Sequence, residues 1–174
     1  MIRTDPLRNP QPLIRRVYAY AAYRLGDGPD AEDATSDTFE RALRYRSGYD
    51  PQKGEPVAWL LGIARRCVDE VYKSRPQASE LVAEVASSVD IEPETVQRLS
   101  IRGALLGLDE RSQELVALRY GADLTARQIA ELLGERTNTV EVALHRALAR
   151  LRSDLREDEQ QAGGRTSPVP KSAL

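Results

Sequence analysis

The segment from Leu124 to Leu151 constrains the fold of this 174-residue chain more than any other part of it. Thr125 and Gln128 have the spacing of a capping box at a helix start, and Gly134 suits the left-handed residue that ends a helix. The apolar residues that follow recur every three or four positions and share one helix face: Val140, Leu144, Leu148, Leu151 and Leu155. This pattern predicts a helix-turn-helix, whose second helix can lie in the major groove of DNA.

The composition favours a purely helical fold. Apolar residues make up 41% of the chain, but Trp, Phe and Met occur once each, so Leu, Val, Ile and Ala must build the core. The single cysteine, Cys67, excludes an internal disulfide and falls on the apolar face of a helical pattern, where we expect it to be buried. No apolar run approaches the ~20 residues that span a membrane, and the N-terminus is too polar for a secretory signal. A soluble, cytoplasmic protein is expected.

The first part of the chain is predicted to form a helical domain over residues 11–75, after an N-terminal extension, 1–10. Asp30 is placed to cap a helix that contains Phe39. The segment 46–56 is dense in Gly, Pro and Asp, which predicts a loop. A further helix follows, with these apolar residues in register: Val57, Leu60, Leu61, Ala64, Val68 and Val71.

The remainder is predicted to be a second domain on a tether. Residues 76–95 lose periodicity and gain Ser, Pro and Glu, which indicates a flexible linker. Residues 96–156 form the second helical domain, with helices near 97–107 and 109–120, the latter begun by Asp109 and ended by Gly121. Residues 157–174 have little to bury and are predicted to be disordered. The expected fold class is all-α, with two small helical domains joined by a flexible linker.

The charge balance predicts that the free chain binds DNA weakly. The net charge is −2 and the pI is near 5.6. The last helix is locally basic, with Arg136, Arg146, Arg150, Arg152 and Arg156 against Glu141 and Asp154. DNA affinity depends largely on the neutralisation of phosphates by basic side chains. On a chain with this charge balance, another partner would have to supply that affinity.

Three segments, in this order, resemble the extracytoplasmic-function (ECF) type of bacterial RNA polymerase sigma factor. DAEDATSDTFERAL (30–43) is similar to the helix of the second conserved sigma region that docks on the polymerase core. YDPQKGEPVAWLLGIARRCVDE (49–70) resembles the segment that melts and reads the −10 promoter element. The segment 108–152, which includes HRALARLR, resembles the fourth region, which reads the −35 element. The match spans about residues 11–156.

The resemblance implies a transcription initiation factor with no catalytic residues, metal or cofactor of its own. It implies core RNA polymerase as partner, through its β′ coiled coil and β flap, together with promoter DNA. An anti-sigma factor that wedges between the two domains is a further expected partner. Membrane insertion is not expected.

The polymerase contact is assigned by this resemblance to one face of the helix at 30–43. It comprises Asp30, Glu32, Asp33, Asp37, Glu40 and Arg41. From spacing alone, a solvated helix face accounts for these residues as well.

The −10 contact is expected around the loop and the helix after it. Aromatic faces bind unstacked bases, so Tyr45 and Tyr49 with Lys53 could hold an extruded base, although an ordinary loop with partly packed tyrosines explains them equally. Trp59 lies in an apolar run, which favours a core role. The outer side of the helix adds residues suited to phosphate or template contact: Arg65, Arg66 and Lys73.

The −35 contact is expected on the outward face of the last helix. Asn138 could read a base edge, Val142 could touch a thymine methyl, and Arg146 could bind guanine or phosphate. The lone His145 is a groove contact or a solvent-facing residue. The full candidate set is Arg127, Thr137, Asn138, Thr139, Glu141, Val142, His145 and Arg146. The family pattern usually has an apolar residue at Glu135 and Lys at Glu141, so the promoter sequence does not follow.

Three other functions stay open at this point. A stand-alone helix-turn-helix regulator would bind duplex DNA as a dimer, but it has no reason to carry the segments at 30–43 and 58–65. An enzyme could use Asp30, Glu32, Asp33 and Asp37 as a metal site, although the helix dipole explains acids at a helix start. A sigma-like protein with degenerate promoter recognition would keep the fold and lose the DNA reading.

Overall fold

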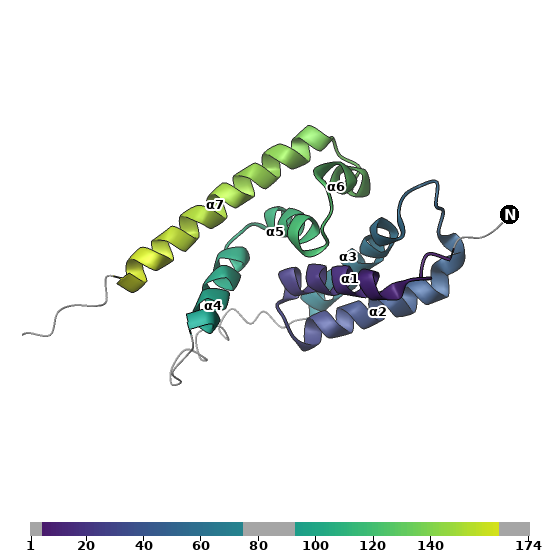
Figure 1. The fold of residues 1–174 in the computed structure, drawn as a ribbon, viewed down its shortest axis with the longest axis horizontal. Helices are drawn as coiled ribbons and strands as arrows, with labels where there is room; N and C mark the ends of the chain where they lie inside the picture. The colour runs from purple at the N-terminus through teal and green to yellow at the C-terminus, as the bar shows by residue number, and fades with distance from the viewer. Residues whose placement is uncertain (1–4, 75–92, 164–174) are drawn as a thin grey trace, which may run out of the picture.

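The structure is a computed structural model and describes residues 5–74 and 93–163. Within these ranges every regular element is helical (Figure 1). A first group of helices contains α1 (Pro10–Leu25), α2 (Pro29–Tyr45) and α3 (Pro56–Ser74); a second contains α4 (Pro93–Leu106), α5 (Glu110–Val116), α6 (Ala126–Leu133) and α7 (Thr137–Gly163). The predicted all-α fold class is confirmed. The predicted linker, 76–95, lies outside the described residues except for its last three positions, which belong to α4.

The first group forms because α3 has a continuous apolar face. Leu60, Leu61 and Val68 are fully buried against α1 and α2. Cys67 is buried on the same face, as predicted, and burial raises the pKa of its thiol. Thr38 is buried on α2, where its hydroxyl donates to the carbonyl of Ala34 at 2.6 Å. This bond compensates for the loss of water around the hydroxyl.

The start of α2 differs from the prediction. Gly28 occupies the N-cap position and Pro29 is the first helical residue, so Asp30 is not the cap. Proline suits this position because the first helical N–H has no partner within the helix. Asp30 instead lies in the first turn, where its negative charge favours the helix dipole.

The helix predicted at 109–120 is divided in two. Asp109 caps α5 as expected, accepting from the N–H of Ser112 at 3.0 Å. After Val116 the chain continues as a π-helical turn, η2 (Ala117–Gly121), and the N–H of Ala122 reaches back to the carbonyl of Ala117 at 2.9 Å. The wider turn brings Gly121 against the backbone of α1.

The helix-turn-helix forms as the sequence predicts. The side-chain oxygen of Thr125 accepts from the N–H of Gln128 at 3.2 Å, and the Gln128 side chain accepts from the N–H of Thr125 at 2.9 Å. Gly134 ends α6 with φ of 69°. The long helix α7 then continues through Gly163, so the prediction of disorder is wrong for residues 157–163. Glu, Gln and Ala in this stretch are good helix formers, which favours the extension of α7.

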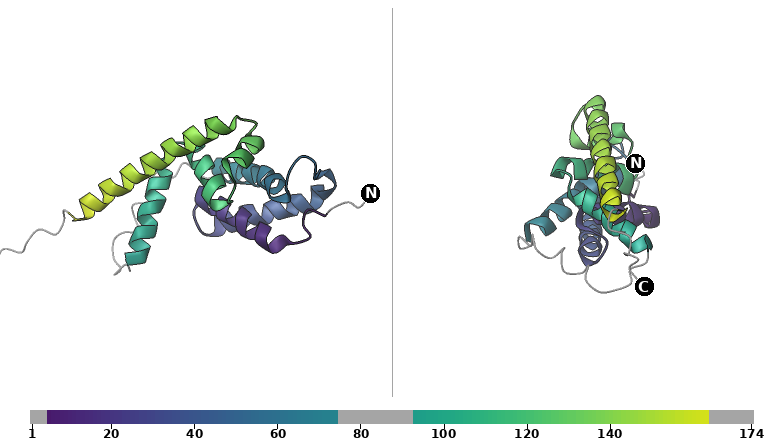
Figure 2. Two further views of the ribbon diagram at one scale, coloured as in Figure 1. Left: turned by 45° about the horizontal axis from the view of Figure 1, so that its top comes forward. Right: turned by 90° about the vertical axis from the view of Figure 1, so that its left-hand side faces the viewer.

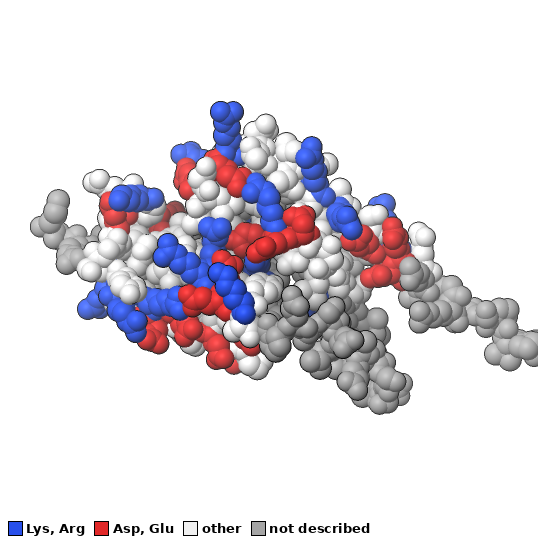
Figure 3. Space-filling model, turned by 180° about the vertical axis from the view of Figure 1, so that it is seen from behind, with Lys and Arg blue, Asp and Glu red and all other residues white. Residues whose placement is uncertain are grey.

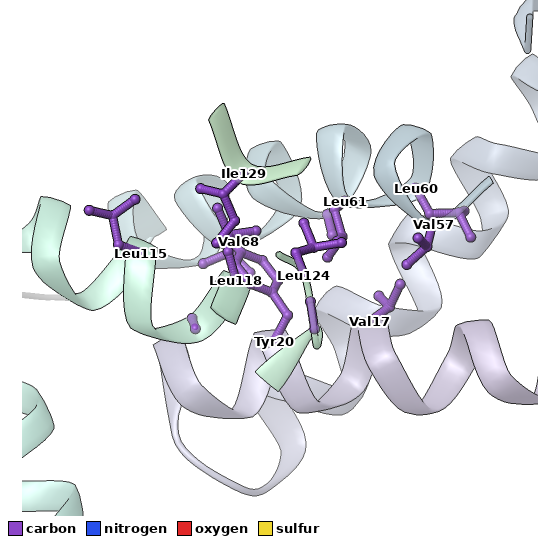
Figure 4. Close-up of a cluster of buried hydrophobic side chains, with 14 of the residues drawn as sticks. Val17, Tyr20, Val57, Leu60, Leu61, Val68, Leu115, Leu118, Leu124 and Ile129 are labelled. Carbon is purple, nitrogen blue, oxygen red and sulfur yellow. The ribbon is translucent and has the colours of Figure 1, made fainter. Parts of the chain in front are cut away.

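The two groups pack on one apolar core, which the sequence pattern did not predict. Figure 4 shows Leu118 and Leu124 of the second group beside Tyr20 and Val68 of the first, and these side chains are fully buried. α5, η2 and α6 thus lie between α7 and the first group, while α4 and the later part of α7 project away from it (Figure 2). A smaller cluster of Leu108, Val116 and Ala147 holds α5 against α7.

Replacing the cap residue Asp109 by Ala should lower the free energy of unfolding by about 1 kcal/mol at neutral pH. Hydrogen bonds from the side chain and backbone of Ser112 hold the pKa of Asp109 below its usual range. The stabilisation is therefore present above about pH 4 and is lost as the pH falls through this lowered value. Urea unfolding of both proteins between about pH 3 and 7 tests this, and equal stability at pH 7 would contradict it.

Candidate nucleic-acid interface

The acidic face of α2 points to solvent. Glu32, Asp33, Asp37 and Glu40 are exposed, and Asp30 is half-buried. α2 packs on α1 and α3 through its other side, which carries buried residues such as Ala31 and Thr38. The face is therefore available to a basic partner.

Two ion pairs shape one edge of this face. Arg41 makes a two-fold contact with Glu70 of α3, at 2.9 and 2.5 Å, and Arg44 bonds Glu40 at 2.6 Å. The bond from Arg41 lowers the pKa of the Glu70 carboxyl. Arg41 thus links α2 to α3. The sequence predicted that Arg41 contacts the polymerase and did not predict this ion pair.

The loop between α2 and α3 presents two tyrosines differently. Tyr45 is 59% exposed at the end of α2. Tyr49 follows the short 3₁₀ turn η1 (Arg46–Gly48) and is half-buried, with its ring centroid 5.5 Å from that of Trp59. Its hydroxyl donates to the carbonyl of Gly54 at 3.0 Å. Trp59 is only half-buried, so the expected core role holds for part of its surface.

A cleft of about 590 Å³ joins this loop to the helix-turn-helix. Tyr49, Lys53 and Trp59 line one side, and Arg127 and Leu132 of α6 line the other. The side chain of Gln128 reaches across to Glu55 at 3.4 Å. Two residues predicted for −10 contact and one predicted for −35 contact therefore share one cleft.

The other basic candidates of α3 lie outside this cleft. Arg66 and Lys73 are exposed. Arg65 is half-buried, and its Nε donates to the carboxylate of Glu114 in α5 at 2.6 Å. Arg65 is thus engaged by the second group of helices.

The outward face of α7 is open along its first turns. Val140, Leu144 and Ala147 face inward and are buried. All seven candidates on α7 are exposed: Thr137, Asn138, Thr139, Glu141, Val142, His145 and Arg146. Arg127 is exposed on α6 and pairs with Glu131 at 2.9 Å. The structure therefore brings the −35 candidates onto two adjoining helices.

Glu135, where the family resemblance predicts an apolar residue, has a partner that the sequence did not reveal. Arg111 of α5 contacts both of its carboxylate oxygens, at 2.7 and 2.5 Å. This bond lowers the pKa of Glu135. The pair links α5 to the turn before α7.

Charge is mixed on the surface seen in Figure 3, where basic and acidic side chains are interleaved over one face of the molecule. This agrees with the near-neutral net charge, from which weak DNA binding by the free chain is predicted. Among the described residues, no cluster of His, Cys, Asp and Glu is suited to a metal ion, and no helix is long and apolar enough to cross a membrane.

Comparison with known families gives two matches in the order of the chain. Residues 11–85 match Sigma-70 region 2, and residues 98–151 match Sigma-70, region 4. The first range contains α2, α3 and all of α1 except Pro10, and the second contains the helix-turn-helix with the start of α7.

Curated relatives agree with these matches. The chain is 30% identical over 149 residues to the ECF RNA polymerase sigma factor SigK of Mycobacterium ulcerans, a match that covers 80% of each chain. It is 32% identical over 149 residues to the ECF RNA polymerase sigma factor BldN of Streptomyces coelicolor, covering 79% of this chain and 56% of BldN.

Two solved structures share the fold. The sigma factor RpoE of Bartonella quintana, in complex with the anti-sigma factor NepR, is 20% identical with a TM-score of 0.64, covering 83% of this chain and 92% of that one. CnrH, in complex with the cytosolic domain of CnrY, is 24% identical with a TM-score of 0.59, covering 87% and 84%.

The contact between Tyr49 and Trp59 can be tested by fluorescence, because Trp59 is the only tryptophan. Removing the ring in Tyr49→Ala should expose Trp59 to water and shift its emission to longer wavelength. Tyr49→Phe keeps the ring and loses only the bond to Gly54, so its emission should stay near that of the unaltered protein. Identical spectra for all three proteins would refute the contact.

Proposed function

Because this chain belongs to the ECF sigma factors of bacterial RNA polymerase, we propose that it binds core polymerase through α2 and reads promoters through the α2–α3 loop, α3, α6 and α7. The observation that carries the proposal is the order of the two sigma regions together with exposed candidate faces on the matching helices. The chain acts as a specificity factor and performs no reaction of its own.

The core contact is proposed for the exposed acids of α2. Glu32, Asp33 and Asp37 present negative charge along one helix face and are suited to a basic surface such as the β′ coiled coil implied by the family. Complementary charge speeds encounter and fixes orientation. Polymerase then supplies the DNA affinity that an acidic chain lacks.

The −10 contact is proposed for the loop and α3. Tyr45 is exposed enough to stack on an extruded base, and Tyr49 and Trp59 offer a second aromatic surface in the cleft. Lys53, Arg66 and further basic side chains would hold the phosphates.

The −35 contact is proposed for the outward face of α7. Asn138 and Arg146 carry the donors and acceptors that read base edges, and Val142, 42% exposed, suits a thymine methyl. Glu141 would repel a phosphate but can accept from the amino group of cytosine. Arg127 on α6 adds a backbone contact.

Partners and location follow from the same assignment. A cytoplasmic protein is proposed, since its polymerase is there. An anti-sigma factor is also proposed as a regulator. Two structural neighbours support this: RpoE was solved in complex with the anti-sigma factor NepR, and CnrH was solved in complex with the cytosolic domain of CnrY.

The whole proposal is tested by capture of purified core RNA polymerase on the immobilised chain, followed by run-off transcription on sheared genomic DNA. Stable binding and discrete transcripts are expected, and the transcripts identify the promoters. Binding without transcripts would favour degenerate promoter recognition, whereas no binding by folded protein would favour a stand-alone regulator.

Charge reversal in Asp33→Lys with Asp37→Lys should weaken core binding about tenfold, because both acids face solvent on the proposed docking face. The matched control reverses the exposed acids Glu157 and Asp158 on α7. Core affinity measured by fluorescence anisotropy checks this, and equal losses in both variants would remove α2 from the interface.

Arg146→Ala should reduce transcription from −35-dependent promoters about 5- to 100-fold, the effect of one lost base or phosphate contact. Core affinity should be unchanged. Arg152→Ala, also exposed on α7 but outside the proposed set, is the control. A loss of core binding in Arg146→Ala would contradict the assigned role.

A further inference from the structure

The cleft between the α2–α3 loop and α6 has the size of a small-molecule site. Its volume of about 590 Å³ lies within the range of about 300–1,000 Å³ that is typical of such sites. The start of α3 forms its third wall. The promoter contacts proposed above use only part of this lining, so the cleft has room and polar groups for a further ligand.

One wall of the cleft is aromatic and is fixed by a hydrogen bond. The ring centroids of Tyr49 and Trp59 lie 5.5 Å apart, with their planes tilted by 57°. The bond from the Tyr49 hydroxyl to the carbonyl of Gly54 holds the first ring in place. Leu132, half-buried on α6, belongs to the opposite side. Because every nucleobase has a π face that can stack on an aromatic side chain, this wall is suited to a flat base.

Two cations stand at the rim, on opposite sides of the cleft. Lys53 is exposed in the loop, and Arg127 is exposed on α6. The ion pair of Arg127 with Glu131 uses its Nε, so the terminal nitrogens can still donate to a ligand. Charged N–H donors form strong hydrogen bonds with phosphate oxygens. The rim is therefore suited to a phosphate attached to the stacked base.

The acidic residues of the lining restrict which nucleotide fits. Glu55 is exposed, and the bond that its carboxylate accepts from Nε2 of Gln128 is long, at 3.4 Å. An ionised carboxylate can only accept hydrogen bonds. On the Watson–Crick edge, guanine offers two adjacent donors, the ring N–H and the amino group, whereas adenine offers the amino group alone. With Asp50 and Glu131 the lining carries three acids against two cations, which disfavours a ligand with several phosphates.

We propose that this cleft is a binding site for a free guanine mononucleotide. The base stacks on the wall of Tyr49 and Trp59 with its edge on Glu55, and the phosphate lies between Lys53 and Arg127. Binding itself needs only the free chain. Its consequence rests on the proposed sigma function: Tyr49, Lys53 and Arg127 are proposed promoter contacts, so the bound nucleotide competes with promoter DNA and lowers transcription.

The emission of Trp59, the only tryptophan, measures this binding in the full-length chain. Titration with GMP should quench the emission and reach saturation, because the base stacks beside the indole ring. Guanosine lacks the phosphate and AMP lacks the second donor, so each should bind more weakly by about tenfold or more. Inorganic phosphate should leave the emission unchanged at the same concentrations.

Variants of the lining test each contact. Lys53→Ala and Arg127→Ala should each weaken GMP binding about tenfold and leave guanosine binding unchanged, because each removes a phosphate donor. Glu55→Gln should remove the preference for GMP over AMP, because the amide NH₂ group opposes the second donor of guanine. Arg152→Ala, exposed on α7 and outside the cleft, is the matched control and should bind GMP as the unaltered chain does. Circular dichroism checks that each variant is folded.

Run-off transcription with core polymerase measures the consequence of binding. GMP should lower transcription by the unaltered chain, with half-inhibition near the concentration that half-saturates the quenching. Glu55→Gln, which is not a proposed promoter contact, should need about tenfold more GMP for the same inhibition. This comparison separates binding in the cleft from any direct effect of GMP on polymerase.

The site is refuted if GMP causes no saturable quenching up to about 5 mM, or if Arg152→Ala weakens binding as much as Arg127→Ala. The phosphate contact is refuted if guanosine binds as tightly as GMP. Competition with promoter DNA is refuted if GMP inhibits the unaltered chain and Glu55→Gln at the same concentration. A failure of the proposed function looks different, because the unaltered chain would then yield no transcripts even without GMP, whereas the quenching would still decide whether the cleft binds the nucleotide.

Discussion

The carboxylate of Glu114 is the point on which the arrangement of this chain depends. It is the acceptor for Tyr20 and Arg65 and the nearest counter-charge of the buried Arg24, and all three come from the other helical group. Without it, the guanidinium of Arg24 would be buried beside only two more distant carboxylates, and the burial of a poorly paired charge is costly. The apolar contacts of Leu118 and Leu124 supply burial, which has no preferred direction. The polar network and the close approach at Gly121 add contacts of definite geometry.

The same network connects fold and function through Arg65. The family resemblance assigns Arg65 of α3 to nucleic-acid contact, yet in the structure it is an ion-pair partner of Glu114 in α5. Under the proposed function, DNA and Glu114 compete for this side chain. DNA binding must then release enough free energy to offset the loss of the ion pair.

Local features of the fold were predictable from the sequence, and features that join distant segments were not. Thr125, Gln128 and Gly134 determine the turn through contacts with neighbours in the chain, so spacing alone identified it. Asp30 was misplaced as a cap because Pro29 can begin a helix one residue earlier. The partners of Arg41 and Glu135 lie 29 and 24 residues away, and no periodicity encodes such pairs. Tyr20 and Leu118 lie at helical spacing. This spacing predicts burial equally well within one helical group and between the two groups.

The division of α7 into a buried and an exposed face has a consequence for divergence between related chains. Val140, Leu144 and Ala147 hold the helix, while the residues proposed to read DNA contribute nothing to that packing. Exposed substitutions usually alter stability by no more than about 0.5 kcal/mol. Promoter preference can therefore drift through successive single changes without a stability threshold to cross. Paralogues within one genome could acquire separate sets of genes while their scaffolds remain interchangeable.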